Sequence, residues 1–564
     1  MKNLKILGNT KIIAMQQIKE NIIPLLICII SILTLAIVAY PFLTAQFTII
    51  NESIAIPDFA LDGSKIINDK NISQNIVIQL LGGYKILEGF FFHHHMTILL
   101  PVYYLDMGID RNINQYGVLT SYYIFFISKF LFREVSLNSY MSIIHSFLII
   151  FPICLSFIGY KVYNNKYLVS LLILVFTLTY ILLDFVNFYL TPTISPMRQI
   201  FIPFIFYFIY KVFVKDDKDF LIYLYLFLLL QSFIFIELSI FIIVSIIFQT
   251  LVKNNIKIEK NLTLKNLIIL IIIILIFLFN NFNSDNYFSN FNFIFLGPEL
   301  NLFDLSVITI LLSLVMYIVS SSVADSKNHL FIRIIGGYCI FSLLYFVWNP
   351  AYNHLGPIIW PFSFLLLFFI DKFIIIKNFT TTFMILFLTT IFTISFATKH
   401  FYIEKNLFYT SLTSYLKVYK LDINNKINME STINPKYIED SCKLMNKYNK
   451  NLSINMISIH DSYLPFLCNK ANSKYDQLII NMVNDEIKMD AYSYFINEEI
   501  IFVDNFIDNP NQEIYYKIYS EALHYRIKIL AIQQARDLFN KIIEDGNYKL
   551  IDKGELISVY MKKN

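Results

Sequence analysis

The chain has 564 residues, of which 56% are hydrophobic and 15% are charged. A soluble protein carries about 45–50% and about 25%, so these values exclude a single soluble globule. The net charge of +4 is small for this length and gives no indication of nucleic-acid binding.

The charged residues are concentrated toward the carboxyl end. Residues 399–564 contain 21 Lys/Arg and 21 Asp/Glu, whereas residues 1–398 contain only 44 charged residues. The sequence therefore predicts a mainly α-helical, polytopic membrane domain over 1–398 and a soluble domain over 399–564. The second part is long enough to form a core of its own.

Apolar runs of about 20 residues predict about eleven transmembrane helices. These spans cover residues 21–44, 140–160, 167–190, 199–214, 220–235, 237–252, 266–282, 303–323, 330–349, 355–371 and 379–398. The spans 220–235 and 237–252 share one apolar run, so their boundary is the weakest feature of this pattern. The apolar stretches 96–105 and 116–132 are assigned to the membrane surface.

Lysine and arginine predict the orientation of these spans. With the N-terminus in the cytoplasm, the inner segments hold 17 Lys and Arg residues, whereas the short outer loops hold only Arg198. The large loop 45–139 and the domain 399–564 are then extracytoplasmic. We expect a multi-pass protein of the bacterial cell (inner) membrane.

The outer domain alternates helical and extended patterns, which predicts a small α/β layer domain. The expected elements are a helix at Pro435–Asn449, strands at Ile454–Ile459 and Glu499–Phe506, a long amphipathic helix at Gln512–Ile543 and two strands over Lys549–Lys562.

The chain has five cysteines. Cys442 and Cys468 both fall in the outer domain, where an oxidising environment permits a disulfide. Their pairing is a hypothesis. The other three, Cys28, Cys154 and Cys339, fall in predicted spans and are expected to pack as small apolar residues.

Loop 45–139 is rich in groups that suit acid–base chemistry. It contains eight Asp and Glu residues, and its stretch 87–120 adds three consecutive histidines and Arg111 beside aromatic runs. A carboxylate partly buried near a membrane has a raised pKa and suits a general base. The alternative is an ordinary polar outer loop that contains acids.

Several short motifs resemble one superfamily of membrane enzymes. They are QYGVLTSYY (115–123) with an amphipathic stretch to Phe132, SPMR (195–198), IFIELSI (234–240), WNPAYNHLGP (348–357) and YKLIDKGELISVYMKK (548–563). Together with the order of spans and loops, they resemble the GT-C superfamily of polyprenyl-phosphate-sugar-dependent glycosyltransferases, such as mannosyltransferases and arabinosyltransferases. In these proteins a stretch similar to QYGVLTSYY forms a juxtamembrane helix in the first outer loop.

The resemblance implies a transfer reaction on the outer face. A carboxylate of the first outer loop activates an acceptor hydroxyl, and a lipid phosphate leaves from the sugar. We expect Glu88, which precedes His93–His95 and the QYG segment, to be this catalytic base. Asp58 and Asp62 are the alternatives, since they lie nearer the first span, where the acid of the family often sits. The chain lacks the Asp-Glu pair that some members have there. The partners are then the lipid bilayer, a polyprenyl-phosphate-linked sugar and a glycan, lipid or protein acceptor, in biosynthesis of a cell-envelope polysaccharide or related glycan.

Further residues are candidates for substrate binding. They are His93, His94, His95, Asp106, Asp110, Arg111, Gln115, Tyr116, Arg198, Glu237 and His354. We predict no cofactor. A divalent metal at the histidine run is the less favoured alternative, since three consecutive residues cannot all point at one ion.

Two of these candidates have simple structural alternatives. Arg198 could serve membrane topology instead of phosphate binding. Glu237 lies in an apolar run, where an ionisable group is costly, but in a tight outer turn it could serve packing.

Three other functions compete with the transferase. A lipid-linked oligosaccharide flippase or transporter would explain the many spans, but the chain has no internal repeat. A surface-polysaccharide polymerase usually has its large outer loop between later spans. A structural or sensory membrane protein with an outer binding domain is the third.

Overall fold

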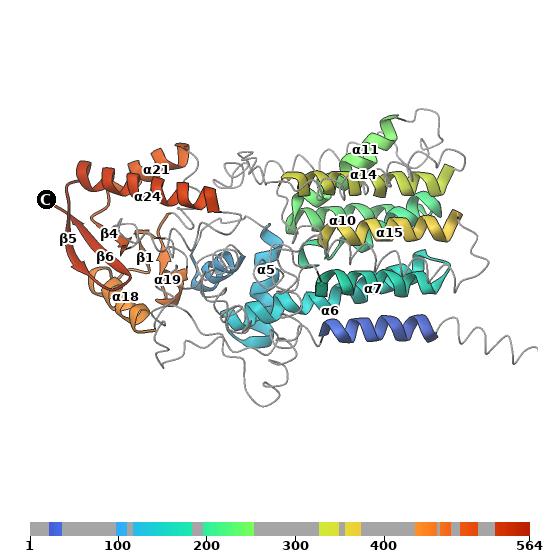
Figure 1. The fold of residues 1–564 in the computed structure, drawn as a ribbon, viewed down its shortest axis with the longest axis horizontal. Coiled ribbons are helices and arrows are strands. Elements are labelled where there is room, and N and C mark those ends of the chain that lie inside the picture. Colours follow the sequence, from blue (N-terminus) through green and yellow to red (C-terminus); the bar gives the residue numbers. More distant parts are fainter. Residues whose placement is uncertain are drawn as a thin grey trace, which may run out of the picture.

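The computed structural model is mostly helical (Figure 1). It describes residues 22–36, 98–109, 117–182, 196–252, 326–348, 356–373, 435–458, 463–474, 485–505 and 525–563.

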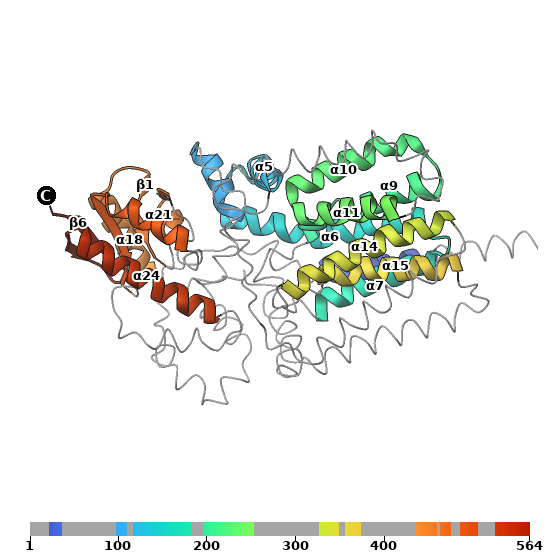
Figure 2. The same ribbon diagram turned by 90° about the horizontal axis from the view of Figure 1, so that it is seen from above.

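A bundle of apolar helices forms the largest of the three hydrophobic cores in the described residues. Its helices run alongside one another in both Figure 1 and Figure 2. They are Ile22–Ala36, α6 (Leu137–Val162), α7 (Lys166–Leu182), α9 (Ile202–Ile209) with its continuation η5 (Tyr210–Val214), α10 (Leu221–Ile234), α11 (Ile236–Val252), α14 (Ser326–Trp348) and α15 (Gly356–Phe373).

Aromatic side chains fill the centre of this bundle. Phe206 of α9 packs on Tyr338, Trp360 and Phe364, with ring centroids 5.4 to 5.7 Å apart. All four of these side chains are at most 1% exposed. Helices α9, α14 and α15 therefore meet along one buried aromatic contact, which fixes the positions of their ends.

Two helical stretches, Ser142–Val162 and Pro196–Val214, are long and apolar enough to cross a membrane. Shorter apolar helices include Lys166–Tyr180 and Glu237–Gln249. The predicted spans 266–282, 303–323 and 379–398 lie outside the described residues. The other predicted spans overlap with the bundle helices named above, and the number of eleven spans stays a prediction.

Lysines gather with paired aspartates at one end of the bundle. There the turn between α6 and α7 is held by Asp371 of α15, whose carboxylate accepts hydrogen bonds from the backbone N–H groups of Asn164 and Asn165, both at 2.9 Å. At the same end Lys327, in the first turn of α14, pairs with Asp216. We call this the lysine end.

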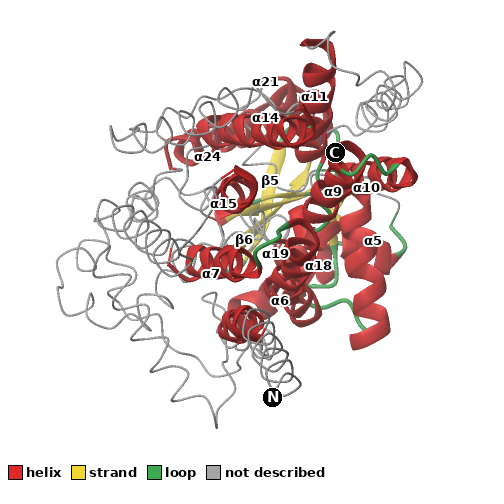
Figure 3. Cartoon of the chain, turned by 90° about the vertical axis from the view of Figure 1, so that its right-hand side faces the viewer, coloured by secondary structure: helices red, strands yellow, loops and turns green. Residues whose placement is uncertain are grey.

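Helix α5 (Val118–Ile127) runs across the opposite end of the bundle instead of along it. Figures 1 and 2 show it crosswise to the bundle helices, and Figure 3 shows it lengthwise while α15 is seen end-on. A wider helical turn, η2 (Ser128–Phe132), continues it. The placement of residues 116–132 at the membrane surface stays a prediction.

The helix Ile98–Met107 differs from the sequence-based expectation. Residues 96–105 were expected at the membrane surface, yet Ile98, Leu99, Leu100 and Val102 are at most 2% exposed. They belong to a protein core shared with α5, α6 and the carboxyl-terminal elements. Tyr103 illustrates the contact, because its ring packs edge-on against Phe466 at 4.7 Å. Protein packing therefore accounts for the apolarity of this stretch.

The residues after 435 form a mixed sheet between two layers of helices (Figure 1). Its strands β2 (Met456–Ile457), β4 (Ile500–Asp504), β6 (Ile557–Lys562) and β5 (Tyr548–Lys553) lie in this order, with β2 and β4 parallel and the other pairs antiparallel. A separate parallel pair joins β1 (Ser453–Ile454) to β3 (Ala471–Asn472).

Alternate residues of β4 face the two helical layers. Phe502 faces the core that contains α18 (Pro435–Tyr448) and α19 (Tyr463–Leu467). Ile501 and Val503 face the core formed with α21 (Asp485–Phe495) and α24 (Tyr525–Asp545). This alternation is the ordinary consequence of the pleat of a strand.

Most of the expected elements in this region agree with the structure. The helix at Pro435, the strand at Glu499–Phe506 and the final pair of strands correspond to α18, β4 and β5–β6. The single strand expected at Ile454–Ile459 was wrong, because the segment is divided between β1 and β2, which pair with different partners. Residues 512–524 of the expected long helix lie outside the described residues.

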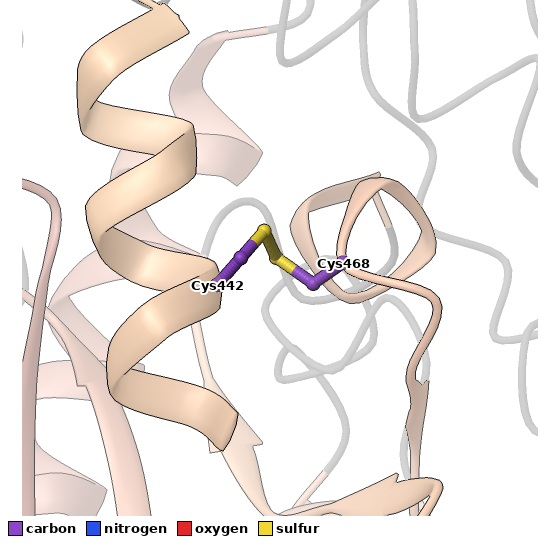
Figure 4. The surroundings of a disulfide bond; sticks show 2 residues. All are labelled: Cys442 and Cys468. Carbon is purple, nitrogen blue, oxygen red and sulfur yellow. A yellow bond between two sulfur atoms is a disulfide. The ribbon is translucent and has the colours of Figure 1, made fainter. Parts of the chain in front are cut away.

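A disulfide joins Cys442 of α18 to Cys468, just after α19, which agrees with the hypothesis drawn from the sequence (Figure 4). The two residues are 26 positions apart. Cys28, Cys154 and Cys339 are free thiols.

Removing this disulfide should destabilise the carboxyl-terminal region. We expect Cys442→Ser with Cys468→Ser to lower its free energy of unfolding by about 3–4 kcal/mol, the loop-closure effect for a loop of this size. Hydrogen exchange of β4 and β6 in the full chain measures the change. A reducing agent should lower the protection of the wild type to that of the double variant and should leave the double variant unchanged. If the oxidised wild type and the double variant had equal protection, the disulfide would have no stabilising role.

Candidate functional site

The site is built on the break between α10 and α11, at the end opposite the lysine end. Phe235 has an extended backbone, with φ −157° and ψ 105°, and its N–H donates to the carbonyl of Gln231 at 2.8 Å. Helix α11 begins at the next residue. The boundary predicted between 235 and 237 is therefore confirmed, although neither proline nor glycine marks it.

Glu237 lies in the first turn of α11. A carboxylate there interacts favourably with the positive end of the helix dipole. The side chain is half-buried, and its Oε2 atom is shielded from solvent. The tight turn considered in the sequence analysis is thus present, and it explains how an acid is tolerated in an apolar run.

Arg198 packs against the same break. It belongs to η4 (Pro196–Gln199), a short turn that precedes α9, and it is only 8% exposed. Its guanidinium carbon lies 3.5 Å from the centre of the Phe235 ring, which is a cation–π contact. Its backbone carbonyl accepts a hydrogen bond from Nε2 of Gln231 at 2.6 Å. Two contacts therefore fix Arg198 beside Phe235.

Residues from α15 and α6 support this arrangement. Nε1 of Trp360 donates to Oε1 of Gln199, the neighbour of Arg198. The Trp360 ring packs edge-on against Phe151 of α6 at 5.2 Å. Gln199 and Trp360 are 4% and 1% exposed, so this is a buried hydrogen bond. The turn that bears Arg198 is consequently held from two sides.

Sequence reasoning missed Gln199, Gln231 and Trp360. A signal for Gln231 existed, because an amide within the apolar run LIYLYLFLLLQSFI must find a hydrogen-bond partner when it is buried. Gln199 and Trp360 are 161 positions apart, and no local pattern links them.

Gly117 lies at the same place. It precedes α5 with φ +86°, and a Cβ atom at this residue would lie 2.1 Å from the carbonyl oxygen of Phe233. The backbone of Gly117 therefore contacts the last turn of α10, two residues before Phe235. Only glycine allows this approach, because the contact is with backbone atoms.

Asp106 has a different environment. It pairs with Lys129 of η2 and lies on the helix Ile98–Met107. Nearby, burial together with the Asp106 charge raises the pKa of Tyr103 to about 12. The Tyr103 phenol is consequently neutral. The ion pair gives Asp106 a role in joining the helix Ile98–Met107 to η2.

The remaining site candidates lie outside the described residues. They are Glu88, Asp58, Asp62, His93, His94, His95, Asp110, Arg111, Gln115, Tyr116 and His354. Among the described residues, the structure places Arg198, Glu237 and Gly117 at the α10–α11 break. Among the described residues no group of three His, Cys, Asp or Glu side chains could hold a metal ion.

The described part of the site combines a cation, a carboxylate and amides in a sheltered position. Arginine donates hydrogen bonds in a planar fork that matches phosphate oxygens. A carboxylate accepts hydrogen bonds from hydroxyl groups such as those of a sugar. The arrangement is suited to an anionic ligand that also has hydroxyl groups.

Comparisons with known proteins give no assignment. No protein-family model matches the chain, and no curated protein matches it.

Proposed function

We propose that the protein is a membrane glycosyltransferase that moves a sugar from a polyprenyl-phosphate donor to an acceptor hydroxyl on the extracytoplasmic face. One observation carries the proposal: Arg198, Glu237 and Gly117, which are distant in the sequence, lie at the α10–α11 break. The same motifs resemble those of GT-C enzymes, and this resemblance suggests a glycosyltransferase site at the break.

The proposed placement in the membrane has eleven spans, with the lysine end in the cytoplasm. Cationic residues are expected on the cytoplasmic side. The site, α5 and the carboxyl-terminal region then lie on the outer side. The exposed side chains of α5 and η2 support this placement, since large apolar groups such as Phe126, at 62% exposure, and Phe130, at 83%, suit the bilayer interface.

In the proposed reaction the base in the first outer loop, Glu88 or else Asp58 or Asp62, accepts the proton of the acceptor hydroxyl. The hydroxyl oxygen forms a bond to the anomeric carbon while the bond from that carbon to the donor phosphate breaks. The leaving phosphate takes the electron pair, and Arg198 stabilises its charge. Glu237 accepts hydrogen bonds from sugar hydroxyls. The reaction needs no cofactor.

Arg198→Met tests the phosphate-binding role. The variant keeps an unbranched apolar stem against Phe235 but removes the charged fork, so we expect sugar transfer in membranes to fall about 10- to 100-fold, the effect of losing hydrogen bonds to a charged group. Arg198→Lys should retain part of the activity. Transfer of labelled sugar from lipid-linked donor is the measurement.

The matched control is Arg133→Met, which removes an exposed arginine that follows η2 on the same side of the bundle. It should transfer sugar as the wild type does. Full activity of Arg198→Met, or an equal loss in both variants, would remove Arg198 from the site.

A further inference from the structure

Arg333 of α14 is a buried cation near the lysine end. It is 8% exposed, whereas Lys161, Lys215 and Lys218 at the same end are exposed. Lys327, also at this end, pairs with Asp216. Within the described part of the chain, by contrast, Arg333 has no ion pair, side-chain hydrogen bond or aromatic ring contact.

Such a residue is unusual on energetic grounds. Removing an ion from water costs several kcal/mol (on the order of 2 to 10 within a bilayer), and a partner of opposite charge normally offsets that cost. A cation needed only for membrane orientation has no reason to be buried, as the exposed lysines at this end show. Burial of Arg333 therefore points to an anion that belongs in its surroundings.

The packing of α11 on α14 shows what faces Arg333. Phe241 of α11 stacks on Phe341 with centroids 6.0 Å apart. One turn further toward the lysine end, Oγ of Ser245 donates to the carbonyl of Ile334 at 2.7 Å, and a Cβ atom on Gly337 would lie 2.1 Å from that Oγ.

Helices α11 and α14 are antiparallel, so positions that face each other advance by four residues along α11 and go back by four along α14. Phe241 faces Phe341, and Ser245 faces Gly337. The next step places Gln249 opposite Arg333. Gln249 is half-buried, and its neighbour Phe248 is 56% exposed on the outer surface of α11.

We propose that Arg333 and Gln249, at the edge of the α11–α14 contact, bind the phosphate group of an anionic membrane lipid. A guanidinium fork and an amide N–H are the donors that phosphate oxygens require. A lipid headgroup is favoured over free phosphate because the site lies at the lysine end beside an exposed apolar side chain, Phe248. The proposal rests on the membrane placement given above but not on the transferase activity.

Lipid binding by the full-length chain tests the proposal. The protein is reconstituted in phosphatidylcholine nanodiscs with and without phosphatidylglycerol, and thermal unfolding is followed as the anionic lipid is titrated. We expect phosphatidylglycerol to stabilise the wild type and Arg333→Met to need about 10- to 100-fold more lipid for the same shift. Phosphatidylcholine also has a phosphate group, but its own choline neutralises that charge. In phosphatidylcholine alone, Arg333→Met should therefore be at least as stable as the wild type, because a buried charge is removed.

Controls separate this site from general charge effects and from free phosphate. Lys218→Met removes an exposed cation at the same end and should respond to lipid as the wild type does. Gln249→Leu should show a weakened response even if Arg333→Met fails to fold. Inorganic phosphate in phosphatidylcholine nanodiscs should give little stabilisation; an Arg333-dependent effect of phosphate alone would overturn the lipid assignment. Equal lipid responses of the wild type, Arg333→Met and Gln249→Leu would overturn the site.

Discussion

Gly117→Ala is expected to detach α5 from α10. The added Cβ would lie 2.1 Å from the carbonyl oxygen of Phe233 and 2.9 Å from that of Ile234, so the backbone itself must move. The native φ of +86° adds strain for any residue with a side chain. Strain of about 1–3 kcal/mol and overlap of about 1–3 kcal/mol together predict a loss of about 2–6 kcal/mol at this contact.

Hydrogen exchange measures this loss directly. The amides of α5 should exchange faster in Gly117→Ala, while those of α6 and α7 keep their protection. Sugar transfer should fall as well, because the QYG segment leaves the α10–α11 break.

Gly108→Ala is the matched control. Gly108 also has a positive φ, of +67°, but no heavy atom lies within 4 Å of the added Cβ. It should lose only about 1 kcal/mol, the strain of a left-handed residue. If the two variants had the same exchange pattern, the close approach of Gly117 to α10 would not be what positions α5.

Glu88→Gln is expected to reduce sugar transfer by about 10²- to 10⁴-fold, the contribution of a positioned general base. Glutamine has nearly the same shape but cannot accept the proton of the acceptor hydroxyl. The measurement is transfer from lipid-linked donor in membranes that contain equal amounts of each protein.

The control for this change is Glu134→Gln. Glu134 is an exposed carboxylate in the same outer loop, and its replacement should leave transfer unchanged. If Glu88→Gln is fully active, the base is sought at Asp58 or Asp62. If Asp58→Asn and Asp62→Asn are also fully active, the result would count against the proposed transferase function.

The sequence predicted the helical elements well because their signals are local. The apolar run over residues 220–252 indicated two short helices, and the structure has the break between them at Phe235. The pattern at Lys549–Lys562 likewise predicted two strands, and β5 and β6 are present. Periodicity and turn residues within a dozen positions suffice for such elements.

Two assignments could not be made from local patterns. The stretch 96–105 is apolar on all sides, and composition does not distinguish lipid from a protein partner such as Phe466. Within Ile454–Ile459 the chain changes its pairing partner from β3 to β4, which depends on residues far along the sequence. Both depend on tertiary contacts.

The charged residues of the site were predictable from the sequence, but the residues that hold them in position were not. Arg198 and Glu237 are conspicuous because they are ionisable groups at the ends of apolar runs. Gln231, Gln199 and Trp360 matter only through hydrogen bonds that span 33 and 161 positions. The role of Gly117 likewise depends on Phe233, which approaches it only in the folded chain.

Glycan and lipid-linked-sugar analysis of a deletion strain tests the proposed function most directly. The account predicts that one sugar is missing from a cell-envelope glycan, that its polyprenyl-phosphate donor accumulates, and that the wild-type gene restores the sugar while Glu88→Gln does not. Accumulation of an intact lipid-linked oligosaccharide would indicate a flippase or polymerase instead. An unchanged glycan and lipid profile would contradict the transferase altogether.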